Sequence, residues 1–199
     1  MNKQEYFLQK RKEHFNNFNL DLKKRRDKFI NWLLTKNWNP TIKVFEMYPY
    51  ENDVLKNEPR IPQYKKEYVF CNTRLKTHSE TRAEIDNLPF DKTIRIITDI
   101  CLELMKYKYH FAVFYAEGQR SPHIIIYDFE ELKDFTPFQR EKAQLEFWRS
   151  IVPFQFQYLD KSIWGDLHTV PLEFTPHWKY GTPFNLLFEY IPEVKKCKG

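Results

Sequence analysis

A short polar loop near the middle of the chain brings together three side chains that bind phosphate well. The loop spans residues 117–123 and contains Arg120, Ser121 and His123, immediately before an apolar run. Guanidinium, hydroxyl and imidazole groups all donate hydrogen bonds to phosphate oxygens, and arginine can do so with two N–H groups at once. The loop therefore predicts a phosphate-binding site. The alternative is a hairpin turn whose histidine bonds to the backbone.

A second polar group follows in the last quarter of the chain. Asp160 ends one predicted strand, and His177 and Lys179 precede Gly181 and the last predicted strand. Side chains two residues apart in an extended segment lie on the same side, so we expect the imidazole and the ammonium group to point together. A carboxylate can bind a divalent cation, and the two basic groups can neutralise a triphosphate. A surface turn with a loop lysine is the alternative.

The apolar pattern predicts the elements that position these groups. Two predicted strands, 110–116 and 123–127, flank the first polar loop as a hairpin-like unit. Asp91 is the expected N-cap of a helix that ends near residue 107, and Thr136 with Gln139 forms a capping box for a helix that continues to about residue 148. Further strands are predicted at residues 41–47, 67–71, 154–158, 167–172 and 185–190.

This order of elements favours an α+β fold, because helices and strands do not alternate strictly. We expect a mixed sheet covered by helices over residues 39–199, preceded by a basic helical extension at residues 1–38. The cation run at residues 23–26 could contact a nucleic-acid backbone, and a solvated helix face is the alternative. Trp164 and Trp178 flank the second polar group and could stack on nucleobases, with core packing as the alternative.

The composition excludes several function classes. The 199 residues include only four scattered glycines, so the chain can form neither a dinucleotide-binding glycine motif nor a Walker-type loop. The three isolated cysteines predict no zinc site. The chain also has no apolar run that resembles a signal core or a bilayer span. The isolated cysteines and this lack of apolar runs together indicate a cytoplasmic protein without membrane contact. The net charge of +5 slightly favours polyanionic partners.

Together, the two polar groups resemble motifs of the archaeo-eukaryotic primase superfamily, and within it of the small catalytic subunit of archaeal DNA primase. That family places a Ser-x-His loop between two apolar strands, as FAVFYAEGQRSPHIIIYD does here, and its next motif is similar to DKSIWGDLHTVPLEFTPHWKYG. The resemblance extends over residues 41–190. It implies a primase-like sheet in which Asp160 binds a divalent metal ion and takes part in catalysis. It also implies that the nucleotide is bound by Arg120, Ser121, His123, His177 and Lys179.

One family motif is absent where it is expected. The family carries an Asp-x-Asp pair after the strand predicted at 67–71, and this chain has Cys71 and Thr73 at those positions. Cysteine and threonine are poor substitutes for carboxylates that hold divalent ions. Glu46 on a neighbouring predicted strand could supply a carboxylate. The acidic segment EIDNLPF, residues 84–90, is another candidate, but we expect its charges to cap the following helix.

Two functions are therefore expected. The first is a primase-like replication protein that binds nucleoside triphosphates, single-stranded DNA or RNA, and Mg²⁺ or Mn²⁺, and synthesises primers by nucleotidyl transfer. A primase large subunit or a helicase is its expected partner. The second is a catalytically inactive nucleic-acid-binding or accessory replication subunit, which the Cys71 and Thr73 replacements favour. An unrelated basic α+β protein is a third interpretation, so the sequence leaves enzyme activity open.

Overall fold

The computed structural model describes most of the chain and shows an α+β fold. The described residues are 5, 9, 12–14, 16–35, 44–45, 47–50, 54–57, 72–85, 88–119, 121–129, 132, 134–165 and 168–193. In chain order the elements are α2 (Leu20–Leu34), β1 (Val44–Phe45), β2 (Met47–Tyr50), β3 (Val54–Asn57), β4 (Thr73–Leu75), β5 (Thr81–Ala83), α3 (Phe90–Lys106), β6 (Phe111–Tyr115), β7 (His123–Ile126), α4 (Pro137–Ile151), the 3₁₀ turns η3 (Phe156–Tyr158) and η4 (Lys161–Trp164), β8 (Thr169–Pro171) and β9 (Asn185–Tyr190).

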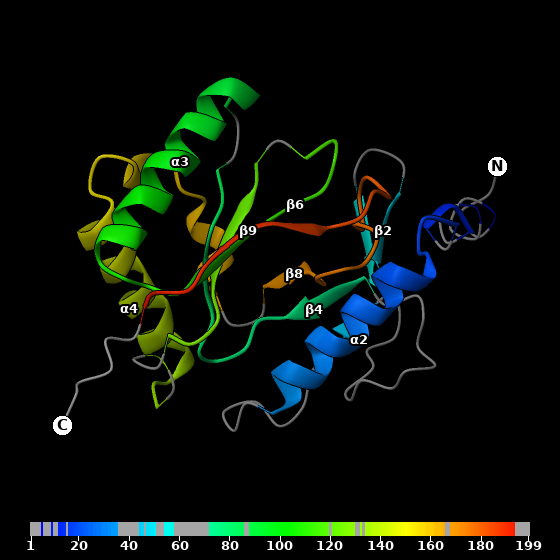
Figure 1. Ribbon diagram of the computed structural model, residues 1–199, viewed down its shortest axis with the longest axis horizontal. Coiled ribbons are helices and arrows are strands. Elements are labelled where there is room, and N and C mark those ends of the chain that lie inside the picture. The colour runs from blue at the N-terminus through cyan, green and yellow to red at the C-terminus, as the bar shows by residue number, and fades with distance from the viewer. Residues whose placement is uncertain are drawn as a thin grey trace.

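The strands form one four-stranded sheet and two smaller sheets. The four-stranded sheet has the order β5-β7-β6-β9, the three-stranded sheet has the order β1-β4-β8, and β2 pairs with β3. All of these pairings between described strands are antiparallel, although the sequence had suggested a mixed sheet. In Figure 1, α3 and α4 lie to one side of β6 and β9, and α2 lies to the other side with β4 and β8.

Two apolar clusters occupy the two faces of the four-stranded sheet, because successive side chains of a strand point to opposite faces. Ile124 and Ile126 of β7 belong to the cluster that includes residues of α3 and α4. Ile125 and Tyr127 belong to the cluster that includes residues of α2. His123 at the start of β7 therefore lies on the α2 side of the sheet. Glu84, which the β5–β7 register sets beside His123, shares this side.

The capping signals of the sequence are confirmed for one helix and corrected for another. The Thr136 hydroxyl accepts from the Gln139 N–H at 3.4 Å, and the Gln139 side chain accepts from the Thr136 N–H at 2.8 Å, so α4 begins with the predicted capping box. Helix α3 instead has Pro89 at its N-cap, with no side-chain cap, and Asp91 lies in its first turn. A carboxylate in the first turn still favours the helix through its dipole.

One predicted strand is wrong. The segment 154–158 contains the 3₁₀ turn η3, in which the Phe156 N–H donates to the Val152 carbonyl at 2.8 Å. Pro153 has no N–H to offer a strand partner, and Phe156 is buried in the core. The strand predicted at 67–71 lies outside the described residues. Strands β6, β7, β8 and β9 match their predicted ranges closely. Within the described residues no helix combines the length and apolarity required to cross a membrane.

Candidate nucleotide site

An ion pair between Glu84 and His123 forms the centre of the candidate site. Strand β5 pairs with β7 so that Ala83 opposes Ile124, and this register sets Glu84, the next residue, beside His123. Glu84 Oε2 lies 2.9 Å from His123 Nε2, with the side chains only 18% and 9% exposed. Burial raises the pKa of the Glu84 carboxyl, but the charge and hydrogen bond of His123 outweigh burial and lower that pKa to about 2. Glu84 is therefore ionised at neutral pH.

The loop before β7 orients His123. Gln119 Oε1 accepts from the Ala116 N–H at 2.7 Å, and the Gln119 amide nitrogen packs 3.0 Å from His123 Nε2, which cannot accept from it while donating to Glu84. The other ring nitrogen, Nδ1, is buried and has no hydrogen-bond partner in the structure. A buried nitrogen without a partner is costly. An acceptor such as a phosphate oxygen would relieve that cost if Nδ1 carries a proton.

Ser121 has a structural role in this loop. Its hydroxyl accepts from the Ile85 N–H at 3.1 Å and donates to the Pro122 carbonyl at 2.9 Å. The hydroxyl proton is therefore used inside the loop, where it ties the loop to the residue that follows Glu84. Arg120, the predicted bidentate phosphate ligand, lies outside the described residues.

Asp160 lies directly beside Glu84 through the backbone. The Asp160 N–H donates to the Glu84 carbonyl at 3.0 Å, and the neighbouring residues Leu159 and Ile85 form an antiparallel bridge. The Asp160 carboxylate caps η4, accepting from the Ser162 N–H at 2.9 Å and from the Ser162 hydroxyl at 2.8 Å. The structure thus brings together two predicted site residues, Asp160 and His123, around a glutamate that sequence reasoning had assigned elsewhere.

His177 and Lys179 lie in a tight turn, which corrects the prediction of an extended segment. The His177 carbonyl accepts from the Gly181 N–H at 2.8 Å, and the left-handed backbone of Gly181, with φ +73°, closes the turn. The Lys179 N–H donates back to His177 Nδ1 at 3.1 Å. The two side chains therefore do not project in parallel from a strand. The imidazole is buried, and the lysine is half-buried.

His177 is a neutral member of the site. Its ring stacks on Trp178 and Tyr180 at centroid distances of 5.4 and 5.0 Å. Burial and, after it, the charge of His123 lower the pKa of His177 to about 3. The imidazole is uncharged at neutral pH, so it cannot supply the positive charge that the sequence had assigned to it. Lys179 remains the candidate cation of this turn.

Two histidines that sequence reasoning left unassigned also belong here. Burial lowers the pKa of His168, while the charges of Glu84 and Asp160 oppose this shift. His14 Nε2 lies 2.9 Å from the His177 carbonyl oxygen, and the Asn17 amide donates to the Gly181 carbonyl at 2.7 Å. The N-terminal residues therefore hold the turn that carries Lys179. No local spacing could have predicted these contacts.

Of the residues weighed for the absent Asp-x-Asp motif, the structure describes Thr73 and Glu84. Thr73 lies in β4, in the three-stranded sheet, while Cys71 and Glu46 lie outside the described residues. The charges of the EIDNLPF segment were expected to cap α3. Glu84 pairs with His123 instead. The sequence feature that could have identified Glu84 as a site residue is its position two residues before Asp86, at the end of a strand.

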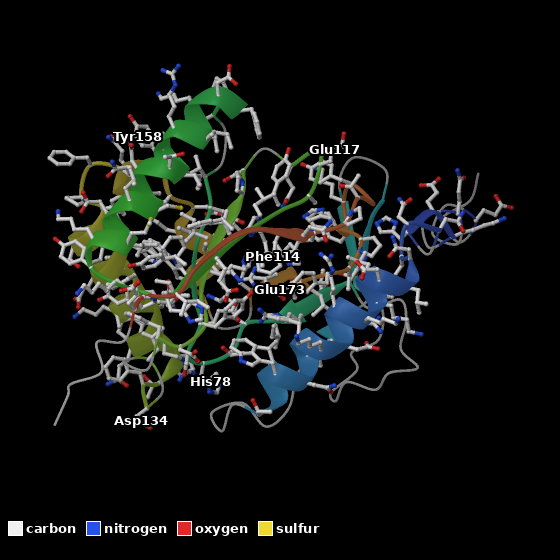
Figure 2. All side chains as sticks on the ribbon, viewed as in Figure 1. His78, Phe114, Glu117, Asp134, Tyr158 and Glu173 are labelled. Carbon is white, nitrogen blue, oxygen red and sulfur yellow. The ribbon has the colours of Figure 1, made fainter. Side chains whose placement is uncertain are left out.

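A buried ionic network adjoins the site. Arg74, Glu80, Arg82 and Glu173 have fully buried side chains and are joined by ion pairs of 2.6–2.7 Å from Glu173 to both arginines and from Arg74 to Glu80, with a further pair between Arg82 and Glu80. The Tyr127 hydroxyl donates to Glu173 at 3.0 Å. Figure 2 places Glu173 near the middle of the molecule. Arg82 lies two residues before Glu84 on the same strand face and helps to lower the pKa of that carboxyl.

The remaining candidate residues have structural roles or lie outside the described part. The Trp164 indole is buried and donates to the Arg82 carbonyl at 2.9 Å, so Trp164 packs in the core and is no base-stacking residue. Among the described residues, no group of three or more histidine, cysteine, aspartate or glutamate side chains is arranged to hold a metal ion. Asp86 and Asp166 lie outside that part of the chain.

Comparison of the chain with protein-family models, with curated proteins and with solved structures gave no match.

Proposed function

We propose that the protein is a primase-like replication protein that binds a nucleoside triphosphate and single-stranded DNA or RNA. One observation carries the proposal, namely the meeting of three chain segments around Glu84. The Glu84 carboxylate pairs with His123 at 2.9 Å, and its carbonyl accepts the Asp160 N–H at 3.0 Å. The order along the chain is a carboxylate, a Ser-x-His loop and an aspartate. This is the order of groups that the resemblance to archaeo-eukaryotic primases implies for nucleotide and metal.

Among the described residues, Glu84 and Asp160 supply carboxylate oxygens for a divalent cation, fewer than the three side chains that a complete protein site would contribute. Mg²⁺ and Mn²⁺ prefer oxygen ligands and can be held by one or two carboxylates together with the phosphates of a substrate. Glu84, which is ionised at neutral pH, and Asp160 would hold such an ion, and Asp86 is two residues from Glu84 in the sequence. When bound, a divalent ion makes the attacking hydroxyl a better nucleophile and neutralises charge on the leaving pyrophosphate.

The side chains of the site have distinct tasks in this proposal. His123 pairs with Glu84 through Nε2 and holds that carboxylate in place. Lys179 balances the charge of the triphosphate, and neutral His177 holds the turn from which Lys179 projects. Ser121 fixes the loop against Ile85. Binding and orientation of the triphosphate thus come from the α2 side of the four-stranded sheet.

Nucleotide incorporation on a single-stranded template tests the proposal. Labelled nucleotide, with Mg²⁺ or Mn²⁺, is supplied to wild type, Asp160→Ala and Glu84→Gln, with Glu103→Gln as a matched control on exposed α3. We expect products from wild type and the control, and a loss of about 100-fold or more in both site variants, as is typical when a charge-stabilising group is removed. Circular dichroism verifies that each variant is folded.

A catalytically inactive binding subunit is the second candidate function. The Asp160 carboxylate is occupied by the Ser162 cap with both of its oxygens, an observation that favours binding without catalysis. This alternative predicts no product but metal-dependent triphosphate binding that weakens in Glu84→Gln, as measured by titration calorimetry. If wild type yields no product and binds no triphosphate, both functions are refuted.

A further inference from the structure

A cavity lies on the α2 side of the four-stranded sheet. It has a volume of about 480 Å³, within the range of about 300–1,000 Å³ for small-molecule sites. Phe29 and Trp32 of α2 form one wall, and Phe114, Tyr127 and Phe174 contribute further rings. Phe114, labelled in Figure 2, is buried. The cavity is thus lined mainly by aromatic faces and edges.

The rings of the cavity are held in place by one another. Phe29 contacts Tyr127 edge-on at 5.6 Å and Phe174 at 5.9 Å, while Trp32 contacts Tyr127 at 5.3 Å. Phe174 adopts a left-handed backbone with φ +59°, which is unusual for a residue with a bulky side chain. Rings fixed in this way lose little freedom when another flat ring binds against them.

The mouth of the cavity is positively charged along α2. Arg25 and Lys28 line it, Arg25 one helical turn before Phe29 and Lys28 one turn before Trp32, and both are exposed. The partner of Arg25 is Asp21 at 3.0 Å, an exposed pair whose contribution is small and which a phosphate can replace. On the opposite wall, Glu189 is paired with His110 at 3.0 Å. One stripe of α2 therefore presents cations outward and aromatic rings inward.

This combination matches one class of ligand. A fatty acid or an apolar peptide would use the rings but only one cation or none. Single-stranded nucleic acid alternates flat bases with phosphates, and proteins bind it by stacking bases on aromatic side chains while cations follow the backbone. We infer that the cavity between α2 and the four-stranded sheet binds single-stranded nucleic acid, with a base against Trp32 and Phe29 and phosphates at Arg25 and Lys28.

The cavity and the Glu84 site lie on the same face of one sheet. Phe114, which lines the cavity, is directly opposite His123 in the β6–β7 pairing, and directly opposed residues share a face. The Phe184 ring lies 5.3 Å from both Phe114 and His123. A nucleic-acid strand bound in the cavity is therefore close to the proposed nucleotide site. The inference rests on the proposed function in identifying the strand as a template or product of that site.

Fluorescence anisotropy with a labelled oligothymidylate, measured between 50 and 200 mM salt, tests the inference. Trp32→Leu removes one stacking partner and should weaken binding at least about fivefold. The exposed double variant Arg25→Gln/Lys28→Gln should reduce the slope of log affinity against log salt by about 1.4, from about 0.7 for each lost contact to a single strand. The control is Lys106→Gln/Lys142→Gln, which removes two exposed cations from α3 and α4 and should leave the slope unchanged.

Each possible outcome decides the inference. Wild type that binds no oligothymidylate at 50 mM salt, or a cavity double variant with the slope of the control, would overturn it. Thymidine monophosphate that competes as well as the oligomer would also overturn it, since the cavity would then bind a free nucleotide. The double variant decides the matter if Trp32→Leu fails to fold. Oligomer binding that persists in Glu84→Gln while triphosphate binding is absent from wild type would support the cavity and refute the proposed function.

Discussion

Replacing Glu173 with glutamine should strongly destabilise the protein. The Glu173 carboxylate is fully buried and accepts four hydrogen bonds: from Arg74 Nε at 2.8 Å, from the Arg74 terminal nitrogen at 2.7 Å, from Arg82 at 2.6 Å and from Tyr127 at 3.0 Å. Wild type balances two buried arginines with two glutamates. The variant retains only Glu80 as a counter-charge, and the new amide N–H₂ group faces arginine donors.

The magnitude follows from the burial of the network. Removing one partner of a buried ion pair typically costs about 3–5 kcal/mol, because the remaining charge stays buried without compensation. For a chain of about 150–250 residues, 1 kcal/mol corresponds to about 2–4 °C in Tm. The expected decrease for Glu173→Gln is therefore about 6–20 °C. The loss is electrostatic rather than a packing defect, since glutamine is nearly isosteric with glutamate.

Urea unfolding at pH 7 measures the effect. Glu103→Gln is the matched control, because it makes the same chemical change in the exposed pair with Lys106, which contributes little to stability. A free energy of unfolding for Glu173→Gln within about 1 kcal/mol of wild type, which is ordinary for a surface change, would refute the view that the network depends on its charge balance.

Two further predictions concern His177 and Thr136. Since burial lowers the pKa of His177 to about 3, the unfolded chain binds a proton below about pH 6.5 that the folded chain does not, and stability should fall as the pH falls, by roughly 3 kcal/mol at pH 4. Urea unfolding at pH 7 and pH 4 should show a smaller fall for His177→Gln, and equal falls would contradict the assignment. Thr136→Ala removes the capping oxygen of α4 and should lower the free energy of unfolding in urea at pH 7 by about 1 kcal/mol. Thr136→Ser keeps a hydroxyl and should retain most of the stability that the cap contributes. Equal stability of the alanine and serine variants would argue against the cap.

Elements with a strong local signal were predictable. The capping box of α4 is formed within four consecutive residues, and β6, β7 and β9 are short apolar runs with flanking turns. The segment 154–158 has a similar composition but forms η3, because Pro153 cannot donate to a strand partner and Phe156 reaches the core from a turn. Composition alone does not distinguish these cases.

The candidate site was predictable only in part. His123 and Asp160 were identified from their residue types and spacing, and the structure places both beside Glu84. The role of Glu84 was missed, because a carboxylate shortly before a helix is also typical of a cap. The neutral state of His177 was missed as well, since it depends on burial among Trp178 and Tyr180 in a turn, and the sequence predicted an extended segment there.

By itself, the sequence determined the α+β class, the capping box of α4, the positions of β6 to β9 and the absence of glycine-rich phosphate loops, because these depend on residues close to one another in the chain. Only the tertiary structure decided which carboxylate meets His123. That contact depends on the register in which β5 pairs with β7, and a shift of one residue would have turned Glu84 to the opposite face. Registers of this kind arise from long-range packing against the two apolar clusters, and for this reason no local pattern contains them.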